Sequence, residues 1–364
     1  MKRMFRRSTT LGLVAATAVL AVAVVTAATA GVKHTGKKSA NIQVCFLLPD
    51  TRTSIRWEQF DRPSMAKSLK AAGVTFTIDN SLGDPQKQKT QADQCLANGA
   101  KVLIIAPIDS GSAAAIEKSA AAKGVKSIDY DRQVEGGVAS VYVSFDGRQV
   151  GVLQGKGVVA GLKANGKYSQ HPVVAELNGG QEDANSFLFK GGYDSVLGPL
   201  YKNGTFKKGP DQFTPAWNNQ TAGTIFEQML VKTGNKIDAL AAANDGLANA
   251  AIVALKAHKL KPIPMSGQDA TPQGVQNIIS GYQTMTVFKD VRKLAVAAAG
   301  AAVALLNGKK PTTTGTVKTK GRALEPAYLI APQSITKANY KLLFTAGFLK
   351  KSDVCNGVYA KYCK

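Results

Sequence analysis

Histidine is scarce in this chain of 364 residues, which contains His34, His171 and His258 and no other. None of the three falls at the carboxyl end of a strand that the sequence predicts, where α/β proteins place their functional groups. The sequence also contains no Gly-x-Ser-x-Gly turn and no phosphate-binding loop that ends in Gly-Lys-Ser or Gly-Lys-Thr. The common motifs of hydrolases and nucleotide-binding enzymes are absent, so we expect no catalytic residue and no cofactor.

Cysteine is rare as well, with four residues and no spacing that is typical of a zinc site. Cys355 and Cys363 lie eight residues apart in the segment "CNGVYAKYC", a loop length that a disulfide can close. Cys45 lies in a predicted strand and Cys95 in a predicted helix, positions that also suit buried thiols. The cysteine pattern therefore predicts a disulfide between Cys355 and Cys363 and no metal site.

Acidic residues are about half as common as basic ones, 24 against 46, which gives a formal net charge of +22. Such an excess suggests nucleic acid as a partner. The lysines, however, are scattered singly along the chain and form neither a basic arm nor a recognition helix. We therefore expect no nucleic-acid partner, and instead an electrostatic association of the lysine-rich surface with an anionic cell envelope.

The first thirty residues have the pattern of a secretory signal peptide. The basic start "MKRMFRRSTT" precedes the apolar run "LGLVAATAVLAVAVVTA" and the small residues "ATAG", which predicts cleavage near Ala30. An uncleaved membrane anchor is the alternative, although the apolar run is short for spanning a bilayer. No cysteine follows the cleavage site, so a lipid anchor is not expected. Residues 31–40 read as a linker, and the mature protein is predicted to lie in the periplasm or on the cell surface.

From residue 41 onward, short apolar strands alternate with helices. Strands such as "IQVCFLLP", "VTFTIDN" and "KVLIIAP" are rich in β-branched residues and are separated by helical segments that end at glycines. This alternation predicts an α/β fold with parallel sheets covered on both faces, and the series occurs twice. We expect two doubly wound lobes, with a ligand cleft outside the carboxyl ends of the strands.

Polar and planar side chains gather at those predicted strand ends, together with both tryptophans of the chain. A carboxylate can accept from two neighbouring hydroxyls, an arginine or amide can donate to ring oxygens, and an indole can cover a C–H face, which is the chemistry of monosaccharide binding. Taken singly, an Asp or Asn after a strand is as readily a helix cap or turn residue. The set is Arg52, Arg56, Trp57, Asp109, Asp131, Arg132, Asp183, Asn185, Phe213, Trp217, Asn244, Asp245, Gln268, Asp269 and Lys289.

The segment "SIDYDRQ", residues 127–133, ends one of these strands with two acids and an arginine. Strand alternation places Asp129 and Asp131 on one side, and we expect Asp131 and Arg132 to point into the cleft while Asp129 supports them from beside it. Paired acids could in principle hydrolyse glycosides. We expect their arginine neighbours to keep both acids ionised, which leaves no general acid.

The segments "RW", "IDYDR", "SFDGRQVGVLQG", "AANDG", "SGQDA" and "QTMTVFKD" resemble, in order and spacing, the xylose-binding and multiple-sugar-binding periplasmic proteins of bacterial ABC importers. These are sugar receptors of the type I, ribose-type fold, and the resemblance covers about residues 42 to 350. It implies a two-domain receptor that closes on one aldose pyranose between its lobes and delivers it to a membrane permease, and we expect the protein to be a monomer. Receptors feeding a chemotaxis or sensor-kinase system are the alternative; a sugar-sensing repressor is not expected, because a signal peptide stands where such proteins carry a helix-turn-helix.

The resemblance also implies which residues contact the sugar. The family's motif often has two asparagines where this chain has Ala184 and Asn185. Weaker candidates from the strand ends are Arg52, Asp109 and Gln268. The implied contacts are Arg56, Trp57, Asp131, Arg132, Asn185, Asn244, Asp269 and Lys289, with Trp217 as a second stacking face.

In this fold three segments cross between the lobes, which we place near residues 147, 287 and 327. The first lobe then consists of residues 41–147 with 287–327, and the second of 148–286 with 328–364. Right-handed crossovers bring the helix that carries Cys95 over the strand that carries Cys45. A disulfide between them and two packed thiols are both compatible with this placement.

Overall fold

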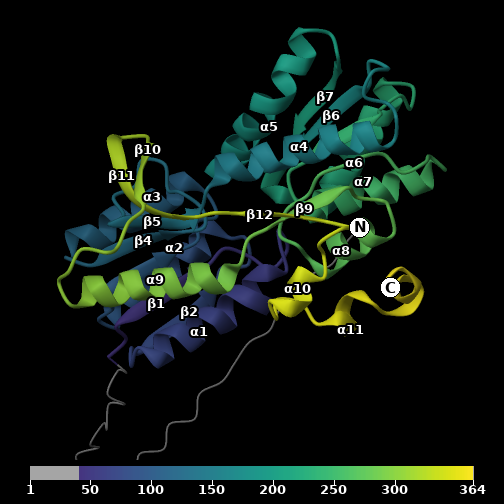
Figure 1. Ribbon diagram of the computed structural model, residues 1–364. Coiled ribbons are helices and arrows are strands. Elements are labelled where there is room, and N and C mark those ends of the chain that lie inside the picture. The colour runs from purple at the N-terminus through teal and green to yellow at the C-terminus, as the bar shows by residue number, and fades with distance from the viewer. Residues whose placement is uncertain (1–40, 364) are drawn as a thin grey trace, which may run out of the picture. The chain divides into compact units, whose positions relative to one another are not determined.

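The computed structural model describes residues 41–363 (Figure 1). The predicted signal peptide and linker, with His34 and the cleavage site near Ala30, lie outside the described residues. Within residues 41–363 no helix has the length and apolar character needed to cross a membrane.

The first lobe is built on a seven-stranded sheet in the order β10-β11-β5-β4-β3-β1-β2. All neighbours pair in parallel except the edge hairpin of β10 and β11. The central strands β1 and β3 are apolar on both faces, as expected for a sheet covered by helices on both sides. The strands are β1 (Val44–Leu48), β2 (Phe76–Asn80), β3 (Val102–Ile105), β4 (Lys126–Tyr130), β5 (Val141–Phe145), β10 (Gly315–Thr319) and β11 (Arg322–Ile330).

Alternate residues of β1 belong to different cores. Val44, Phe46 and Leu48 pack in one apolar cluster with α1 and α9, whereas Cys45 and Leu47 pack in another with α2 and α3. The period-two geometry of a strand thus divides one apolar run between the two faces of the sheet. The helices of this lobe are the π-turn η1 (Trp57–Asp61), α1 (Arg62–Ala71), α2 (Pro85–Ala97), α3 (Ser110–Ala122) and α9 (Val291–Leu306), and α9 lies alongside α1 (Figure 1).

The two disulfides of the described chain lie in different regions. Cys45 of β1 is bonded to Cys95 of α2, with their Cα atoms 6.2 Å apart, so the second of the two alternatives, packed free thiols, is wrong in this structure. Cys355 is bonded to Cys363, as predicted. This second bond closes a loop that contains η3 (Gly357–Tyr362), and the short helices α10 (Leu342–Thr345) and α11 (Lys351–Val354) precede that loop.

The second lobe holds a parallel three-stranded sheet in the order β7-β6-β8, with β9 and β12 paired as an antiparallel ribbon. Single bridges from Met265 to β8 and from Gln268 to β9 connect the two parts. The strands are β6 (Val173–Asn178), β7 (Lys207–Phe213), β8 (Ala239–Ala242), β9 (Met285–Phe288) and β12 (Gln333–Thr336). The helices are α4 (Gly147–Ala164), α5 (Ala184–Lys202), η2 (Pro215–Trp217), α6 (Asn219–Lys232), α7 (Asp245–Ala257) and α8 (Pro272–Ile279).

The chain crosses between the two sheets three times. It leaves the first sheet after β5 for α4, returns after β9 to α9, and leaves again between β11 and β12. The third crossing was predicted near residue 327 and lies instead at residues 331–332, because β11 stays paired with β5 through Ile330. That the lobes move relative to one another about these segments stays a prediction.

Helices α4 and α5 pack unusually close, because glycines face each other where they cross. A side chain at Gly151 would overlap the backbone of Phe189, and one at Gly192 would overlap the backbone of Arg148. This close packing anchors α5, whose first turn carries Asn185 at the edge of the sheet. The glycine-rich segment "GRQVGVLQG" therefore positions part of the site.

Candidate functional site

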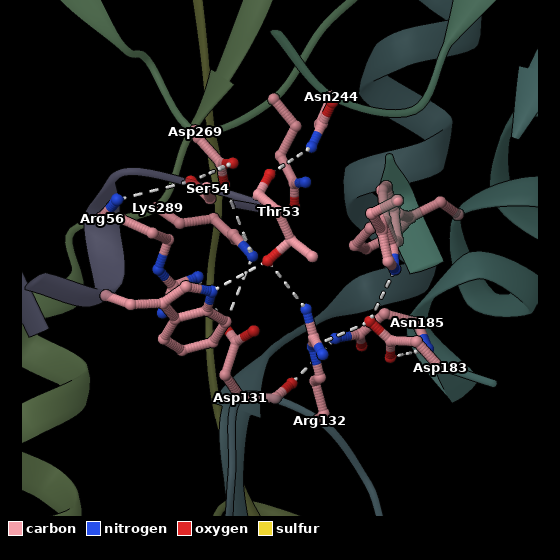
Figure 2. A pocket seen from close by; sticks show the side chains of 14 residues that line it. Thr53, Ser54, Arg56, Asp131, Arg132, Asp183, Asn185, Asn244, Asp269 and Lys289 are labelled. Carbon is pink, nitrogen blue, oxygen red and sulfur yellow. Dashed lines mark hydrogen bonds and ion pairs between the residues drawn. The ribbon is translucent and has the colours of Figure 1, made fainter. Parts of the chain in front are cut away.

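A cavity lies where the carboxyl ends of the two sets of strands face each other (Figure 2). About 310 Å³ within it is not filled by atoms, a figure that includes space open to solvent. Every residue of the main predicted set lines it, and so does the weaker candidate Gln268; that they contact a ligand stays a prediction. The lining residues are Thr53, Ser54, Arg56, Trp57, Asp131, Arg132, Asp183, Asn185, Phe189, Trp217, Asn244, Gln268, Asp269 and Lys289.

Asp131 lies at the centre of the first lobe's contribution and has a left-handed backbone conformation, with φ of 62°. Its carbonyl oxygen accepts hydrogen bonds from Ser144 Oγ (2.7 Å), Tyr142 Oη (3.1 Å) and Asn185 Nδ2 (3.0 Å). Three donors on one oxygen hold this uncommon conformation in place. The turn directs the side chains of Asp131 and Arg132 toward the cavity rather than along the strand.

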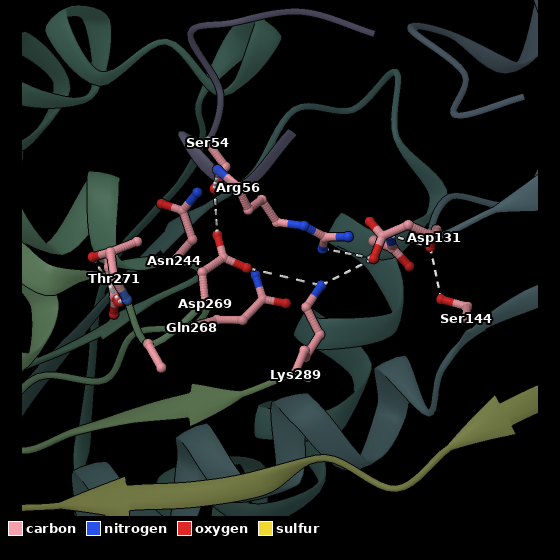
Figure 3. A network of polar contacts seen from close by, with 12 residues as sticks. Ser54, Arg56, Asp131, Ser144, Asn244, Gln268, Asp269, Thr271 and Lys289 are labelled. Carbon is pink, nitrogen blue, oxygen red and sulfur yellow. Dashed lines mark hydrogen bonds and ion pairs between the residues drawn. The ribbon is translucent and has the colours of Figure 1, made fainter. Parts of the chain in front are cut away.

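The carboxylate of Asp131 is paired with two cations. Its Oδ1 accepts from Arg56 Nη1 at 2.8 Å and from Lys289 Nζ at 3.3 Å (Figure 3). Burial by itself would raise the pKa of Asp131, but the charges of Arg56 and Lys289 outweigh it and hold that pKa well below its usual range. Asp131 is therefore an ionised hydrogen-bond acceptor at any physiological pH.

Arg132 joins the two lobes. Its Nε lies 2.9 Å from Asp183 Oδ2, and its Nη1 donates to the carbonyl oxygen of Pro107 at 3.1 Å. Asp183 also accepts from Trp217 Nε1 at 3.1 Å, so one carboxylate of the second lobe orients both a guanidinium and an indole. Burial raises the pKa of Asp183, and the charge of Arg132 opposes this shift.

Both tryptophans are buried at the cavity wall. The guanidinium of Arg56 lies over the Trp57 ring, 4.4 Å from its centroid, and Trp57 Nε1 donates to Thr53 Oγ1 at 3.1 Å. Trp217 packs over Gly179, where any side chain would overlap the indole. The two indoles therefore have fixed orientations and partners for their N–H groups, as buried tryptophans require.

The second lobe adds amide and carboxylate groups from the ends of β8 and the segment before α8. Asn244 caps α7 through Leu247 N (2.8 Å), and its Nδ2 lies 3.5 Å from the carbonyl oxygen of Thr53. Asp269 accepts from Ser54 Oγ at 3.1 Å and lies 3.9 Å from Lys289 Nζ. Asn244 therefore acts both as a helix cap and as part of the cavity wall. An Asn that follows a strand can thus cap a helix and line a binding site at the same time.

Two weaker candidates do not line the cavity. Asp109 caps α3, accepting from Ser112 N at 2.8 Å, and the exposed Arg52 borders grooves outside the cavity. Asp109 follows a strand end as predicted, but the loop after β3 uses its carboxylate to begin the next helix. Arg52 lies four residues before Arg56, in the irregular loop after β1, and is exposed to solvent.

The implied sugar contacts did not include four residues that line the cavity: Thr53, Ser54, Asp183 and Phe189. Asp183 was noted at its strand end but left out of the implied sugar contacts. Thr53 and Ser54 lie in an irregular loop, where short polar residues produce no periodic signal. Phe189 lies on α5 two turns after Asp183, and only the packing of α5 brings its ring to the cavity.

Asp129 is buried behind the binding turn and does not line the cavity, in keeping with the supporting role expected of it. Its Oδ2 accepts from Val134 N at 2.7 Å. The expectation that arginines keep it ionised is wrong: burial, and then the neighbouring carboxyl of Glu117, raise the pKa of Asp129 well above its usual range. Because Asp129 does not reach the cavity, it is no candidate for a general acid there.

The lining side chains combine three cations with three carboxylates, two indoles and several amides. No group of three or more histidine, cysteine or acidic side chains among residues 41–363 could hold a metal ion. The arrangement can donate to and accept from many hydroxyl groups at once and can cover the faces of a small ring.

Comparison with known proteins decides the family. The model of the periplasmic binding protein domain matches residues 45–310. The chain belongs to the periplasmic binding protein family. Among relatives of the family, the D-xylose-binding periplasmic protein of Escherichia coli is 33% identical over 315 residues, covering 86% of this chain and 92% of the relative. The multiple sugar-binding periplasmic receptor of Rhizobium radiobacter is 34% identical over 322 residues, covering 83% of this chain and 89% of the receptor.

Solved structures of the family share the fold. An ABC transporter solute-binding protein of Clostridium phytofermentans with bound β-D-glucose superposes with a TM-score of 0.78 at 29% identity, covering 86% of this chain and 99% of that one. A carbohydrate transporter solute-binding protein of Chloroflexus aurantiacus in complex with D-glucose has a TM-score of 0.77 at 32% identity, covering 86% and 98%. The α/β fold predicted from the strand and helix pattern, and the type I fold implied by the resemblance, are thereby confirmed.

Proposed function

We propose that this protein is an extracytoplasmic receptor that captures one monosaccharide, xylose or a similar aldose pyranose, and delivers it to an ABC importer. The observation that carries the proposal is the cavity wall itself, where paired charged groups and two indoles converge from both lobes. Membership of a family whose relatives include xylose-binding and glucose-bound proteins supports it.

The balance of charges at the cavity supports a neutral ligand. Three cations, Arg56, Arg132 and Lys289, face an equal number of carboxylates on Asp131, Asp183 and Asp269. A net charge near zero offers no advantage to a sugar acid or a sugar phosphate, whereas ionised pairs form strong hydrogen bonds with neutral hydroxyls. This favours an uncharged polyol.

The size of the cavity supports a single sugar ring. Even counting space that is open to solvent, only about 310 Å³ within it is free of atoms. The indoles of Trp57 and Trp217 come from opposite lobes, so a ring bound between them is enclosed only when the lobes are together. Enclosure of this kind matches capture and release better than catalysis, and we propose no enzymatic activity.

Further parts of the proposal concern the surroundings of the receptor. The partner is the permease of an ABC importer, the protein is a monomer exported to the periplasm or cell surface, and its basic surface associates with an anionic envelope. Family membership supports export and the permease partner. The formal charge of +22 supports the electrostatic association, since only four of these charges, on Lys2, Arg3, Arg6 and Arg7, lie in the predicted signal peptide.

A thermal-shift screen tests the proposal. The protein without residues 1–30 is mixed with a dozen monosaccharides, including D-xylose, D-glucose, D-galactose and L-arabinose, and with sugar acids as a charged control. A bound sugar at about 100 times its dissociation constant is expected to stabilise the fold by roughly 2.7 kcal/mol, a clear rise in Tm. Recovery of the sugar unchanged is the second expectation. No stabilisation by any neutral sugar, or conversion of the sugar to a product, contradicts the proposal.

Binding is also expected to change the intrinsic fluorescence, because both tryptophans of the chain line the cavity. Trp57→Phe and Trp217→Phe, made separately, should each remove part of the response to saturating sugar and weaken the affinity. Fluorescence titration of the two variants and the unaltered protein measures both effects. A full response and unchanged affinity in both variants shows that neither indole contacts the ligand.

A further inference from the structure

The chain between the first strand and α1 contains one turn of π-helix, Trp57–Asp61. Its defining bond runs from Arg62 N to the carbonyl oxygen of Trp57, five residues back. The next residue, Pro63, has no N–H and so cannot add a bond of either kind. Single π-turns are rare and are concentrated at functional sites.

The π-turn determines which side chains share a face. In an α-helix, with 3.6 residues per turn, two side chains that are five residues apart point in directions about 140° apart around the helix axis. In a π-helix, with about 4.4 residues per turn, the same two side chains are only about 50° apart. Arg56 and Asp61 are five residues apart, so the π-turn brings onto one face two side chains that an α-helix would separate.

The Asp61 carboxylate accepts two hydrogen bonds from one edge of the Arg56 guanidinium. Arg56 Nε donates to Asp61 Oδ2 at 2.9 Å, and Nη2 donates to Asp61 Oδ1 at 2.7 Å. Asp61 Oδ1 also accepts from the hydroxyl of Tyr130 at 2.7 Å. The Asp61 side chain is fully buried and does not line the cavity, whereas Arg56 does.

These two hydrogen bonds decide which N–H donors of Arg56 remain for the cavity. A guanidinium has five N–H groups in a fixed fork. Two are held by Asp61 and one, on Nη1, is donated to Asp131, so the remaining N–H groups are on Nη1 and Nη2. Arg56 also lies over the Trp57 ring, so its orientation sets the position of the indole as well.

We propose that Asp61 is a positioning residue of the sugar site: through the π-turn it holds Arg56 in the one orientation that serves both Asp131 and a bound sugar. Asp61 touches no ligand and acts through Arg56. Tyr130, the last residue of β4, ties this pair to the strand that leads into the Asp131 turn. The inference rests on the proposed sugar-binding function and extends it to a residue outside the cavity wall.

A double-mutant cycle tests the inference, with D-xylose and D-glucose as the probes in titration calorimetry. Asp61→Asn removes one half of the ion pair while keeping the side-chain shape, and is expected to weaken binding about tenfold or more. Arg56→Lys keeps the charge but lacks the fork needed for two parallel bonds. Because Asp61 acts through that fork, adding Asp61→Asn to Arg56→Lys should change the affinity by less than about threefold.

Glu58→Gln is the matched control. Glu58 lies on the same π-turn and also binds an arginine, Arg62, but it does not line the cavity. Its replacement should leave the affinity unchanged. If Glu58→Gln weakens sugar binding as much as Asp61→Asn does, only the integrity of the turn matters. If Asp61→Asn weakens binding equally in the unaltered protein and in Arg56→Lys, Asp61 does not act through Arg56. Either result overturns the inference.

Folding is checked by circular dichroism and Tm for every variant. If Asp61→Asn does not fold, Tyr130→Phe replaces it in the cycle, because this change removes one hydrogen bond to Asp61 and no charge. Tyr130→Phe is then expected to weaken sugar binding severalfold in the unaltered protein and to have no effect in the Arg56→Lys variant. Binding of neither probe by the unaltered protein would defeat the proposed function as applied to these sugars, and the inference with it. Normal binding by both the unaltered protein and Asp61→Asn overturns the inference alone.

Discussion

Replacing Arg132 with alanine is expected to weaken sugar binding by about a hundredfold or more. The guanidinium is buried and connects the first lobe to Asp183 of the second, at 2.9 Å. Hydrogen bonds to charged groups contribute about 1.5 to 3 kcal/mol each, and the substitution also leaves the buried Asp183 without its cation. Titration calorimetry with the sugar identified in the screen measures the loss. The fold should survive, because Arg132 lies at the cleft edge rather than in an apolar core.

Two neighbouring substitutions complete this test. Asp131→Asn removes the charge that Arg56 and Lys289 share and should also weaken binding strongly. Asp129→Asn is the contrast: the raised pKa of Asp129 means that its carboxyl already tends to carry a proton, which an amide imitates. Near-normal affinity in the first two variants, with the third severely impaired, would mean that the cleft faces the other side of the strand.

Removing the disulfide between Cys45 and Cys95 is expected to lower the free energy of unfolding by about 4 kcal/mol, because the bond closes a loop of 50 residues. Alanine is the suitable replacement at both positions, since both side chains are buried and a serine hydroxyl would need a partner. Urea denaturation followed by circular dichroism gives the free energy for the unaltered protein and the double alanine variant.

The disulfide between Cys355 and Cys363 provides the matched comparison, with a loop of only eight residues. Its removal is expected to cost less, about 2.5 kcal/mol. Mass spectrometry after alkylation without reductant should find no free thiol in the unaltered protein. Alkylation of Cys45 and Cys95 under those conditions, or a loss below about 1 kcal/mol on replacing them, contradicts the expected contribution of this bond.

Much of the site could be predicted because the signals are local. Asp131 and Asn244 follow β4 and β8, Asp269 follows a segment bridged to β8 and β9, and in a parallel fold residues at strand ends gather at one edge. The apolar run of β1, with Val44 and Cys45 on opposite faces, likewise predicts a sheet that is buried on both sides. Each of these features depends only on the direction in which a strand points its side chains.

Other features depend on packing between distant segments. Asp109 and Asp183 look alike in sequence, as acids that follow a strand and begin a helix, yet one only caps α3 and the other also binds Arg132 and Trp217. Phe189 reaches the cavity because α5 crosses α4 at facing glycines. The pairing of β11 with β5 through Ile330 moved the third crossing beyond residue 327, since strand length is set by the neighbour as much as by the strand itself.

The sequence by itself therefore determined the α/β class, the two lobes and most of the polar groups at the strand ends. These follow from composition and from periods of a few residues, which local backbone geometry converts directly into side-chain direction. Tertiary structure alone decided that Cys45 is bonded to Cys95, that Asp183 belongs to the cavity, and that Asp61 holds Arg56. Each of these pairings joins side chains whose approach depends on sheet order, helix crossing or a single π-turn, and no local pattern of residues specifies those distances.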